Sequence, residues 1–451
     1  MLTMNYTYRI YPDAAQQAKL RSWLETCRGV YNYALRELKD WIASRKCPID
    51  RCSLEKEYII PADEPFPSCY RQQNNLPKAK KQFPHLAKVH SQVLQTTIRR
   101  LHDTWEAFQK RGYGFPRFKK QGQFKSFVFP QFKDNPISGS SIKLPKIGKV
   151  PINLHRPIPD GFKVKQVRVL SKVRGTQWYV VVTIESDISV PDAPVHGRAI
   201  GIDLGLERFL TVSDGSFQER PKFFRSMQRK LKLLQRRAAR KQKGSRNWEK
   251  AQIKVARMHH RIENRRKDFH LKTAHKLCDQ AQTIFAEDLN VTGLTGGMLR
   301  KDCVDVAFGQ FLSLLEWVCW KRGVYFAKVN SNGTSQTCPK CFATVSKGLK
   351  IREHHCPECG YRTHRDHAAA EMVLHRGLEN LVAQGLWGTE TACQVVLSGV
   401  YDLDKWRGAG MPDREVRRPA LCRRVSVGRM SLRGTPVPAK SRTLRVTRVS
   451  P

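Results

Sequence analysis

The chain has 451 residues, in which 81 lysines and arginines face 39 aspartates and glutamates, for a formal net charge of +42. A hydrophobic fraction of 40% with nine tryptophans excludes a wholly disordered basic protein and leaves room for two or three packed domains. The excess charge favours a polyanionic partner, with nucleic acid as the first candidate. A ribosome-type or membrane-surface basic protein is the alternative.

Compartment is indicated by the apolar runs and the cysteines. We find no apolar run near the ~18 to 20 residues that span a bilayer, so no membrane partner is expected. The first residues lack the apolar core of a signal peptide. Of 13 cysteines, four sit in two close pairs, which suits a reducing compartment with one metal site. We therefore expect a cytoplasmic protein, associated with the nucleoid in a bacterium.

The first 114 residues predict one strand and two long helices. Residues 4–11 alternate as a strand does, and apolar residues recur at helical spacing from Leu20 to Leu35. A second apolar stripe from Leu94 to Phe108 predicts another core helix. The segment 47–84 is rich in proline and polar residues and is predicted to be a variable loop region within a helical module.

From residue 115 to 185 the pattern changes to short, alternating segments separated by glycine and proline. This pattern predicts a small antiparallel barrel or sandwich. Its first block interleaves phenylalanines with basic residues, which can stack bases and hold phosphates. The candidate nucleic-acid contacts are Arg117, Lys119, Lys120 and Lys125. A solvated lysine face on an amphipathic strand is the alternative.

After the proline-rich linker 191–194, residues 198–215 predict two strands joined by a tight turn. The next 51 residues, 222–272, carry 19 basic and three acidic residues, with a break at 243–246. They predict two basic helices, whose candidate phosphate contacts are Arg229, Arg236, Arg237 and Arg240, or else a solvated face. Strands near 283–289 and 324–330 flank a further apolar helix, which indicates an α/β layer. The last ~70 residues lose periodicity and are predicted to be a disordered basic tail.

Three acidic residues occupy the ends of apolar strands or the start of a helix. Asp203 and Glu287 each close an apolar strand, and Asp366 begins a helix. A charged side chain at the end of a buried strand is unfavourable unless it has a partner. Together the three carboxylates could hold one or two divalent cations, as phosphodiester hydrolysis requires. Taken singly, they are also consistent with a turn residue, a surface acid and a helix N-cap.

Two CxxC pairs give the most specific pattern. Cys338 and Cys341 are followed, after fourteen residues, by Cys356 and Cys359. This spacing fits four thiolates around a closed, structural zinc ion. The nearby histidines are the alternative ligands, or phosphate contacts: His354, His355, His364 and His367.

In order along the chain, the motifs YRIYPDAAQQ, GFPRFKK, GIDLGLERFLTVSDG, FAEDLNVTGL, NSNGTSQTCPKC, and CPECG followed by HRDHAAA resemble those of the TnpB/OrfB family. These are transposon-encoded proteins, long labelled transposases and related to the type V CRISPR effector nucleases. The resemblance covers residues 4 to 375.

The resemblance implies a multidomain α+β fold with a RuvC-like, RNase H-fold α/β nuclease core, an inserted four-cysteine zinc ribbon, and an N-terminal β-barrel with a helical insertion. The implied parts are a barrel (1–12 and 115–195), a helical recognition insertion (13–114), a nuclease domain (196–334 and 363–380), a zinc ribbon (335–362) and a tail (381–451).

The family also implies a reaction. Asp203, Glu287 and Asp366 would be the catalytic, Mg²⁺-binding triad, with two ions, and zinc would be structural. Partners would be a guide RNA copied from the transposon end and a target double-stranded DNA, which is cut where it pairs with the guide. In such a system base pairing reads sequence, while a basic channel reads backbone shape.

The chain departs from the family motif at two positions. Ala368 stands where the family commonly has asparagine, and Met372 replaces a second common asparagine. Loss of an amide near Asp366 would weaken the orientation of that acid, and it is the one support for the alternative function, an RNA-guided DNA-binding repressor that no longer cuts. Because all three acids remain, we predict a nuclease that cuts. A DNA-joining transposase is a third hypothesis, although no module for joining ends is identifiable in the sequence.

Overall fold

The computed structural model describes residues 2–46, 60–61, 63–132, 134–290, 293, 300–348 and 351–386. It divides into two compact units, built around Met1–Val190 with Leu234–Arg257 and around Pro191–Leu233 with the described residues from Met258 onward. Of the tail predicted at 381–451, residues beyond 386 lie outside the described part.

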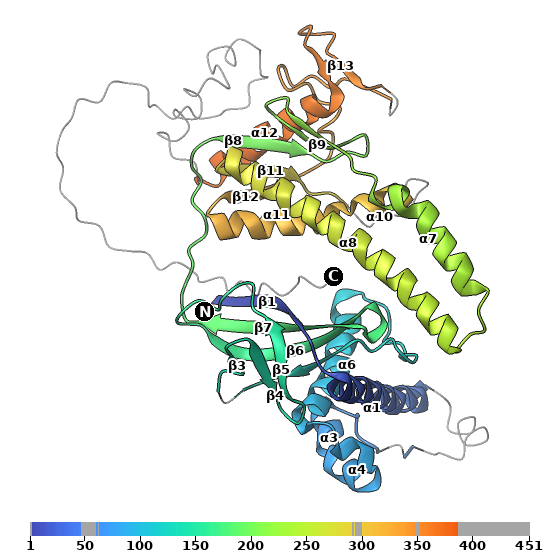
Figure 1. Cartoon of the computed structure of the whole chain (residues 1–451). Coiled ribbons are helices and arrows are strands. Elements are labelled where there is room, and N and C mark those ends of the chain that lie inside the picture. Colours follow the sequence, from blue (N-terminus) through green and yellow to red (C-terminus); the bar gives the residue numbers. More distant parts are fainter. Residues whose placement is uncertain are drawn as a thin grey trace, which may run out of the picture. The chain divides into compact units, whose positions relative to one another are not determined.

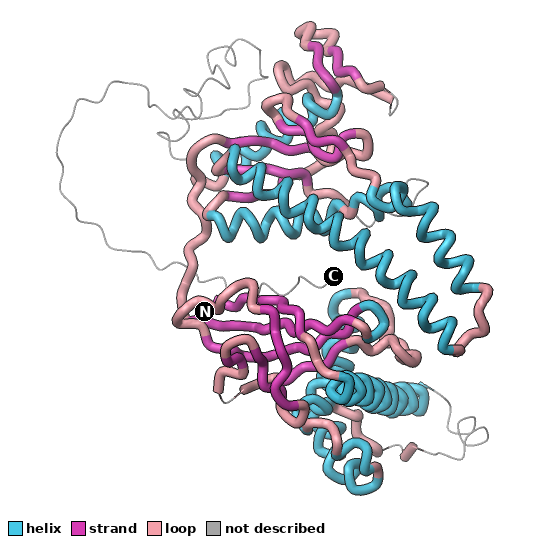
Figure 2. Tube along the Cα trace, in the orientation of Figure 1, coloured by secondary structure: helices cyan, strands magenta, loops and turns pink. Residues whose placement is uncertain are grey.

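A curled antiparallel sheet organises the first unit (Figure 2). Among the described residues it has seven strands in the order β2-β6-β7-β1-β5-β4-β3. The N-terminal strand is central, because it pairs with β7 along its whole length and with β5 on its other side. The strands are β1 (Leu2–Ile10), β2 (Ser126–Phe129), β3 (Ile137–Ser138), β4 (Ser141–Leu144), β5 (Gly148–Asn153), β6 (Lys163–Lys172) and β7 (Gln177–Ser186).

The two predicted long helices are confirmed and pack together against this sheet. Trp23 of the first helix is 1% exposed, and its ring lies 5.6 Å from that of Phe127 on β2. Burial of such a side chain contributes on the order of 2–3 kcal/mol. The helices are α1 (Ala14–Lys46), α3 (Cys69–Asn74), α4 (Leu76–Gln82), α5 (Pro84–Ala87) and α6 (Ser91–Arg111), with a 3₁₀ turn, η1 (Val173–Gly175), before β7.

The second unit contains a mixed sheet in the order β10-β9-β8-β11-β12. Its first three strands are antiparallel, and β8, β11 and β12 are parallel. All the strands predicted for this region are present, which confirms the α/β layer. They are β8 (Ala199–Asp203), β9 (Arg208–Val212), β10 (Phe217–Glu219), β11 (Thr283–Glu287) and β12 (Tyr325–Val329).

Helices cover both faces of this sheet (Figure 1). Alternation along β11 divides the core: Ile284 packs with α11 and the end of α8, whereas Phe285 packs with α12. The two predicted basic helices are confirmed as α7 and α8. The helices are α7 (Phe223–Ala239), α8 (Arg246–Gln280), α10 (Arg300–Val306), α11 (Phe308–Arg322) and α12 (Arg365–Ala383).

The sequence was expected to contain no segment long and apolar enough to span a membrane. This expectation is wrong for Arg300–Arg322, which is long and apolar enough by length and composition alone. The structure gives the reason for that composition. Phe311 and Leu315 are fully buried against the sheet, as in the core helix of a globular domain. Ala307, with φ at 54°, also interrupts the segment between α10 and α11.

Candidate functional site

The strand register places two acids side by side. In the parallel pair β8 and β11, Ile202 lies opposite Ala286. The next residues, Asp203 and Glu287, therefore end neighbouring strands at the same edge of the sheet. Ligand sites form at this edge in open α/β sheets, because the strands end there and the loops diverge.

Helix α12 brings the third acid to the same edge. The helix crosses β8 at Gly201, where an added Cβ would lie 2.2 Å from the carbonyl oxygen of Ala370. Its N-cap is His364, whose Nδ1 accepts from the backbone N–H of Asp366 at 3.2 Å. Asp366 is 8% exposed, and its Oδ2 would lie 3.8 Å from a Cβ at Gly205, two residues after Asp203.

Electrostatics show that the three carboxylates interact. Burial, and then the charges of Glu287 and Asp366, raise the pKa of Asp203 well above its ordinary value. Burial also raises the pKa of Glu287, against the hydrogen bond from Thr334 and the charge of Arg376, which lower it. Three crowded carboxylates repel one another in the ionised form, and a divalent cation relieves that repulsion. The all-oxygen donor set fits Mg²⁺.

A loop after β12 supports this cluster, and motif reasoning assigned it no role. The Thr334 hydroxyl donates to Oε1 of Glu287, which is 7% exposed. Arg376 of α12 donates to the carbonyl oxygens of Asn330 and Asn332, at 2.7 Å each. The loop is thus tied both to the β11 acid and to the helix that carries Asp366. The sequence signal that could have identified this loop is its position between an apolar strand and the first cysteine pair.

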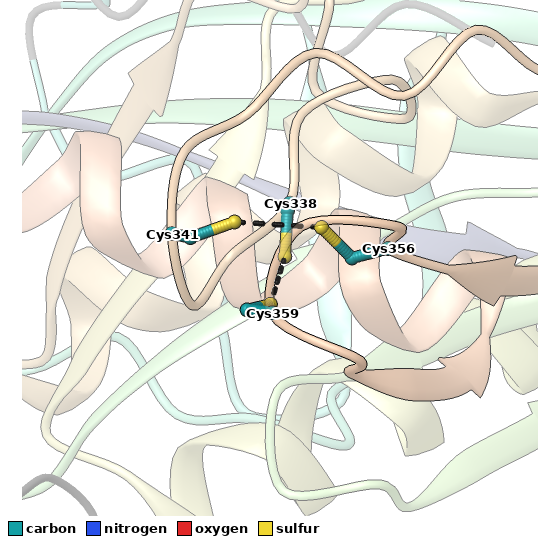
Figure 3. A group of neighbouring side chains, drawn as sticks. All are labelled: Cys338, Cys341, Cys356 and Cys359. Atoms are coloured by element: carbon teal, nitrogen blue, oxygen red, sulfur yellow. Dashed lines mark hydrogen bonds between the residues drawn. The ribbon is translucent and has the colours of Figure 1, made fainter.

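The four predicted cysteines form one cluster, shown in Figure 3. Their sulfur atoms all lie within 4.8 Å of one another. The closest pairs are Cys338 with Cys359, at 3.6 Å, and Cys341 with Cys356, at 3.4 Å. This donor set fits a tetrahedral zinc ion, whose Zn–S bonds of ~2.3 Å require such close sulfurs. The cluster lies between β12 and α12, beside a hairpin of β13 (Glu353–His355) and β14 (Arg362–His364).

The two halves of this cluster have the same backbone design, and we call each half a knuckle. In the first, Phe342 donates its N–H to the carbonyl oxygen of Cys338, at 3.0 Å. In the second, Gly360 donates to that of Cys356, also at 3.0 Å. Both donors have left-handed backbones, with φ of 62° and 69°. The fold thus builds one ligand-presenting turn twice, with glycine in one copy and phenylalanine in the other.

Thiol chemistry differs within the cluster. Burial acts to raise the pKa of Cys356, but backbone N–H groups of Cys359 and Glu358 and the neighbouring thiols lower it to about 7. Burial raises the pKa of Cys341, and the neighbouring thiols raise it further. Zinc binds thiolates, so loading the cluster releases protons.

The alternative histidine ligands do not join the described metal cluster. His354 is fully buried and contacts the Lys347 ammonium, and His364 caps α12. His367 bonds through both ring nitrogens, to Thr363 Oγ1 at 2.9 Å and to the Ser213 carbonyl oxygen at 3.2 Å. His355 lies on β13 and is exposed.

The first block of candidate nucleic-acid contacts lies on a loop pinned to α1. Asn32 donates to the Lys119 carbonyl oxygen at 2.9 Å and accepts from the Lys119 N–H at 2.8 Å. Lys119 is half-buried, whereas the other three candidates are exposed: Arg117, Lys120 and Lys125.

The interleaved phenylalanines of this block correct one expectation. Phe124 and Phe127 are 4% and 2% exposed and belong to the core, because the strand that follows turns them toward α1. Phe115 is half-buried against α6. Phe118 is 45% exposed and carries the Lys39 ammonium 4.7 Å above its ring. Of these four rings, Phe118 alone remains accessible for base stacking.

The second block of candidates lies on or just after α7. Arg229, Arg236 and Arg237 are exposed on this helix, and Arg240 follows its end. The helix buries Leu231 and Ala238 on its other side, so its basic face is free of the core.

Three family profiles match the chain. The profile OrfB_IS605, described as "Probable transposase", matches residues 179–297, and "Cas12f1-like, TNB domain" matches 308–373. A third, "Helix-turn-helix domain", matches 1–47, where the structure has β1 and the single helix α1.

Curated relatives cover most of the chain. A Streptomyces pristinaespiralis protein named "Putative RNA-guided DNA endonuclease" is 30% identical over 380 residues, spanning 83% of this chain and 89% of the relative. The Escherichia coli K12 protein "Putative RNA-guided DNA endonuclease InsQ" is 28% identical over 390 residues, spanning 82% and 92%. A solved Cas12f1–sgRNA–target DNA complex matches with a TM-score of 0.48 at 13% identity, covering 82% of this chain and 98% of that chain.

These matches define a class, the transposon-associated proteins with a sequence link to type V CRISPR effectors. Within that class the chain belongs to the TnpB family of the OrfB/IS605 type.

Proposed function

We propose that this protein is an RNA-guided DNA endonuclease of a transposable element, which hydrolyses phosphodiester bonds with Asp203, Glu287 and Asp366. The observation that carries the proposal is the meeting of three acids from distant segments at one sheet edge, where burial and the charges of Glu287 and Asp366 raise the pKa of Asp203. The names of two curated relatives support the activity.

The proposed fold assignment follows from the sheets. The order β10-β9-β8-β11-β12, antiparallel and then parallel with α12 laid across β8, fits a RuvC-like core of the RNase H type. The curled sheet β1–β7 with α1 and α6 would be the N-terminal barrel and its helical insertion. The cysteine cluster, between β12 and α12, would be the inserted ribbon.

In the proposed reaction the three carboxylates would hold Mg²⁺ at the scissile phosphate. When bound, Mg²⁺ lowers the pKa of attacking water and stabilises the leaving oxygen. The protein's own contribution is orientation. Thr334 fixes the Glu287 carboxylate, and His364 fixes the first turn of α12 around Asp366. Because the pKa of Asp203 is raised, cation binding would compete with protonation of this carboxylate.

The proposed partners are a guide RNA copied from the transposon end and a target double-stranded DNA. The formal charge of +42 and the exposed arginines of α7 support binding to nucleic-acid backbones. Base pairing would then read the target sequence, and the basic surface would read duplex shape.

Cleavage of a plasmid library tests the proposal. The protein is co-expressed with its native flanking DNA, the copurified RNA is sequenced, and a matching target is placed beside randomised flanks with Mg²⁺. Cutting beside one flanking motif, lost in Asp203→Ala, is expected. Absence of cutting with a correctly loaded guide would contradict the proposal.

The second candidate, a guided repressor that binds without cutting, is favoured by Ala368. This residue is 1% exposed and lies in the first turn of α12, at a position where the family commonly has an amide. Binding without cutting in the library experiment would select the repressor. Ala368→Asn would then be the first reversion to test, with restored cutting as its predicted outcome.

A further inference from the structure

Both knuckles of the cysteine cluster touch one face of α12. From the first knuckle, the Lys340 ammonium lies 3.7 Å from Glu371 Oε1, and the Phe342 ring packs edge-on against His375 at 5.5 Å. From the second, the Tyr361 hydroxyl donates to Glu371 Oε2 at 2.7 Å. Glu371 and His375 are one helical turn apart, so they form a single docking face.

This docking face is buried rather than solvated. Glu371 is 5% exposed and His375 is 6% exposed. Burial and then the nearby Lys340 lower the pKa of His375 to about 4, so the ring is neutral at physiological pH. A buried carboxylate is stable where it is paired and hydrogen-bonded, as Glu371 is here. If the knuckles moved away, that carboxylate would lose both partners while it stayed beside the core.

The contacts depend on the shape of the cluster. Lys340 lies between two of the cysteines, Phe342 directly follows Cys341, and Tyr361 follows Cys359 by two residues. A knuckle has little apolar core of its own, so its shape is set by the shared ion. We therefore expect metal in the cluster to stabilise the arrangement in which these three side chains reach α12.

The same helix begins at the proposed catalytic acid. Asp366 lies five residues before Glu371, and α12 fits against β8 at Gly201 with no room for a methyl group. We propose that Glu371 is a positioning residue, and that the zinc cluster holds α12 through it so that Asp366 can complete the magnesium site. This inference rests on the proposed function, because it gives the ribbon's metal control over the nuclease centre.

The chain offers a variant that separates folding of the cluster from docking. Phe342 has a left-handed backbone that suits glycine, as Gly360 shows in the other knuckle. Phe342→Gly should therefore keep the cluster folded and its zinc bound, while it removes the ring from His375. Glu371→Leu removes both polar contacts, and Tyr361→Phe removes one hydroxyl and serves as the milder variant. Glu358→Gln is the matched control, since Glu358 is exposed in the second knuckle.

The test measures zinc per chain, hydrogen exchange of the first turn of α12, and Mn²⁺ affinity by electron paramagnetic resonance, with Mn²⁺ as the probe for the carboxylate site. We expect Phe342→Gly and Glu371→Leu to keep one zinc, exchange faster at Asp366, and bind Mn²⁺ about tenfold more weakly, the usual effect of losing an orienting group. Glu371→Gln should regain most of that affinity, because it still accepts from Tyr361.

Cleavage by the docking variants should be restored by high Mg²⁺. Unchanged Mn²⁺ affinity and exchange in Glu371→Leu, or in Tyr361→Phe if the former does not fold, would overturn the inference. Zinc content, hydrogen exchange and Mn²⁺ affinity can be measured without DNA cutting. An inactive wild-type protein would therefore contradict the proposed function but would not decide the inference about Glu371.

Discussion

The two candidate metal centres of the second unit are assembled in opposite ways. The thiolates of Cys338, Cys341, Cys356 and Cys359 come from two tight turns, and their spacing along the chain already contains the geometry. The carboxylates of Asp203, Glu287 and Asp366 come from two strands and a helix spread over more than a third of the chain. The cysteine centre is formed by residues close together in the chain, whereas the carboxylate centre is formed by sheet register and helix packing.

This difference makes the two centres fail in different ways. A thiolate centre loses its ion when one ligand is changed, and the surrounding turns lose their shape with it. A carboxylate centre keeps the fold when one acid is removed, because mutual repulsion is relieved. Mutation of the carboxylate centre should therefore lower activity without lowering stability. Mutation of the thiolate centre should lower both.

The largest effect is expected for Asp203→Ala. Loss of a carboxylate that holds the cation should lower cutting by at least ~10³-fold, since several kcal/mol of transition-state stabilisation are lost at 1.36 kcal/mol per tenfold. Guide and target binding should persist in gel-shift measurements. Asp268→Ala, at an exposed ion pair on α8, is the control. A variant that still cuts at the wild-type rate would remove Asp203 from the centre.

Cys356→Ser is expected to affect stability instead. Structural zinc contributes on the order of 10–16 kcal/mol to small zinc domains, and one missing thiolate gives up a large share of it. Elemental analysis should find less than one zinc per chain, and the melting temperature should fall. Cys69→Ser, in the other unit, should change neither quantity. Full zinc content in Cys356→Ser would refute the four-thiolate assignment.

Gly201→Ala tests the packing on which the carboxylate centre depends. The new methyl group would meet the Ala370 carbonyl oxygen at 2.2 Å and the Leu374 nitrogen at 2.5 Å, so α12 must shift away from β8. Overpacking of this kind costs about 3 kcal/mol and should slow cutting as Asp366 moves.

The matched substitution is Gly29→Ala within α1, where no atom lies within 4 Å of the new Cβ. It should stabilise the protein by about 0.5–1 kcal/mol, because alanine favours a helix interior. Equal denaturant midpoints for the two variants would contradict the close fit of α12 on β8.

The smallest effect is a pH dependence. The folded-state pKa values of Asp203 and Glu287 are raised, so the folded protein binds protons more tightly than the unfolded chain does. Without divalent cation, their contribution to stability is therefore lost as pH rises through the window above their ordinary values. Added Mg²⁺ should raise the melting temperature more at pH 8 than at pH 5.5, and this difference should shrink in Asp203→Asn. A rise in melting temperature with Mg²⁺ that is equal at both pH values would contradict the raised pKa values of Asp203 and Glu287.

Much of the fold could be predicted because its elements have strong local periods. Strand β1 follows from two-residue alternation, and helices α1 and α6 follow from apolar residues at helical spacing. Helices α7 and α8 follow from a basic run with one break, and β8 and β11 follow from short apolar runs. The cysteine site follows from its spacing in the same way. Taken singly, Asp203 is also consistent with a turn residue, Glu287 with a surface acid and Asp366 with a helix N-cap. Their positions made a shared cation site one hypothesis, and the family resemblance gave them the role of a catalytic triad.

What could not be predicted depends on contacts between distant segments. Thr334 lies in the motif NSNGTSQTCPKC, but the motif does not show that this residue meets Glu287, and Glu371 has no motif of its own. Each pairing is created by the packing of the loop and the ribbon. Phe124 and Phe127 were predicted to stack bases because they are interleaved with basic residues, but the two long helices cover them. A spacing pattern identifies a face, and the tertiary packing decides what that face contacts.

The most direct test of the central claim, that three distant acids form one cation centre, is a Mn²⁺ titration followed by electron paramagnetic resonance. The wild type and the single variants Asp203→Asn, Glu287→Gln and Asp366→Asn are compared at one pH. We predict tight Mn²⁺ binding in the wild type and a marked loss in each variant. Equal Mn²⁺ binding in all four proteins would mean that the three carboxylates do not share a metal.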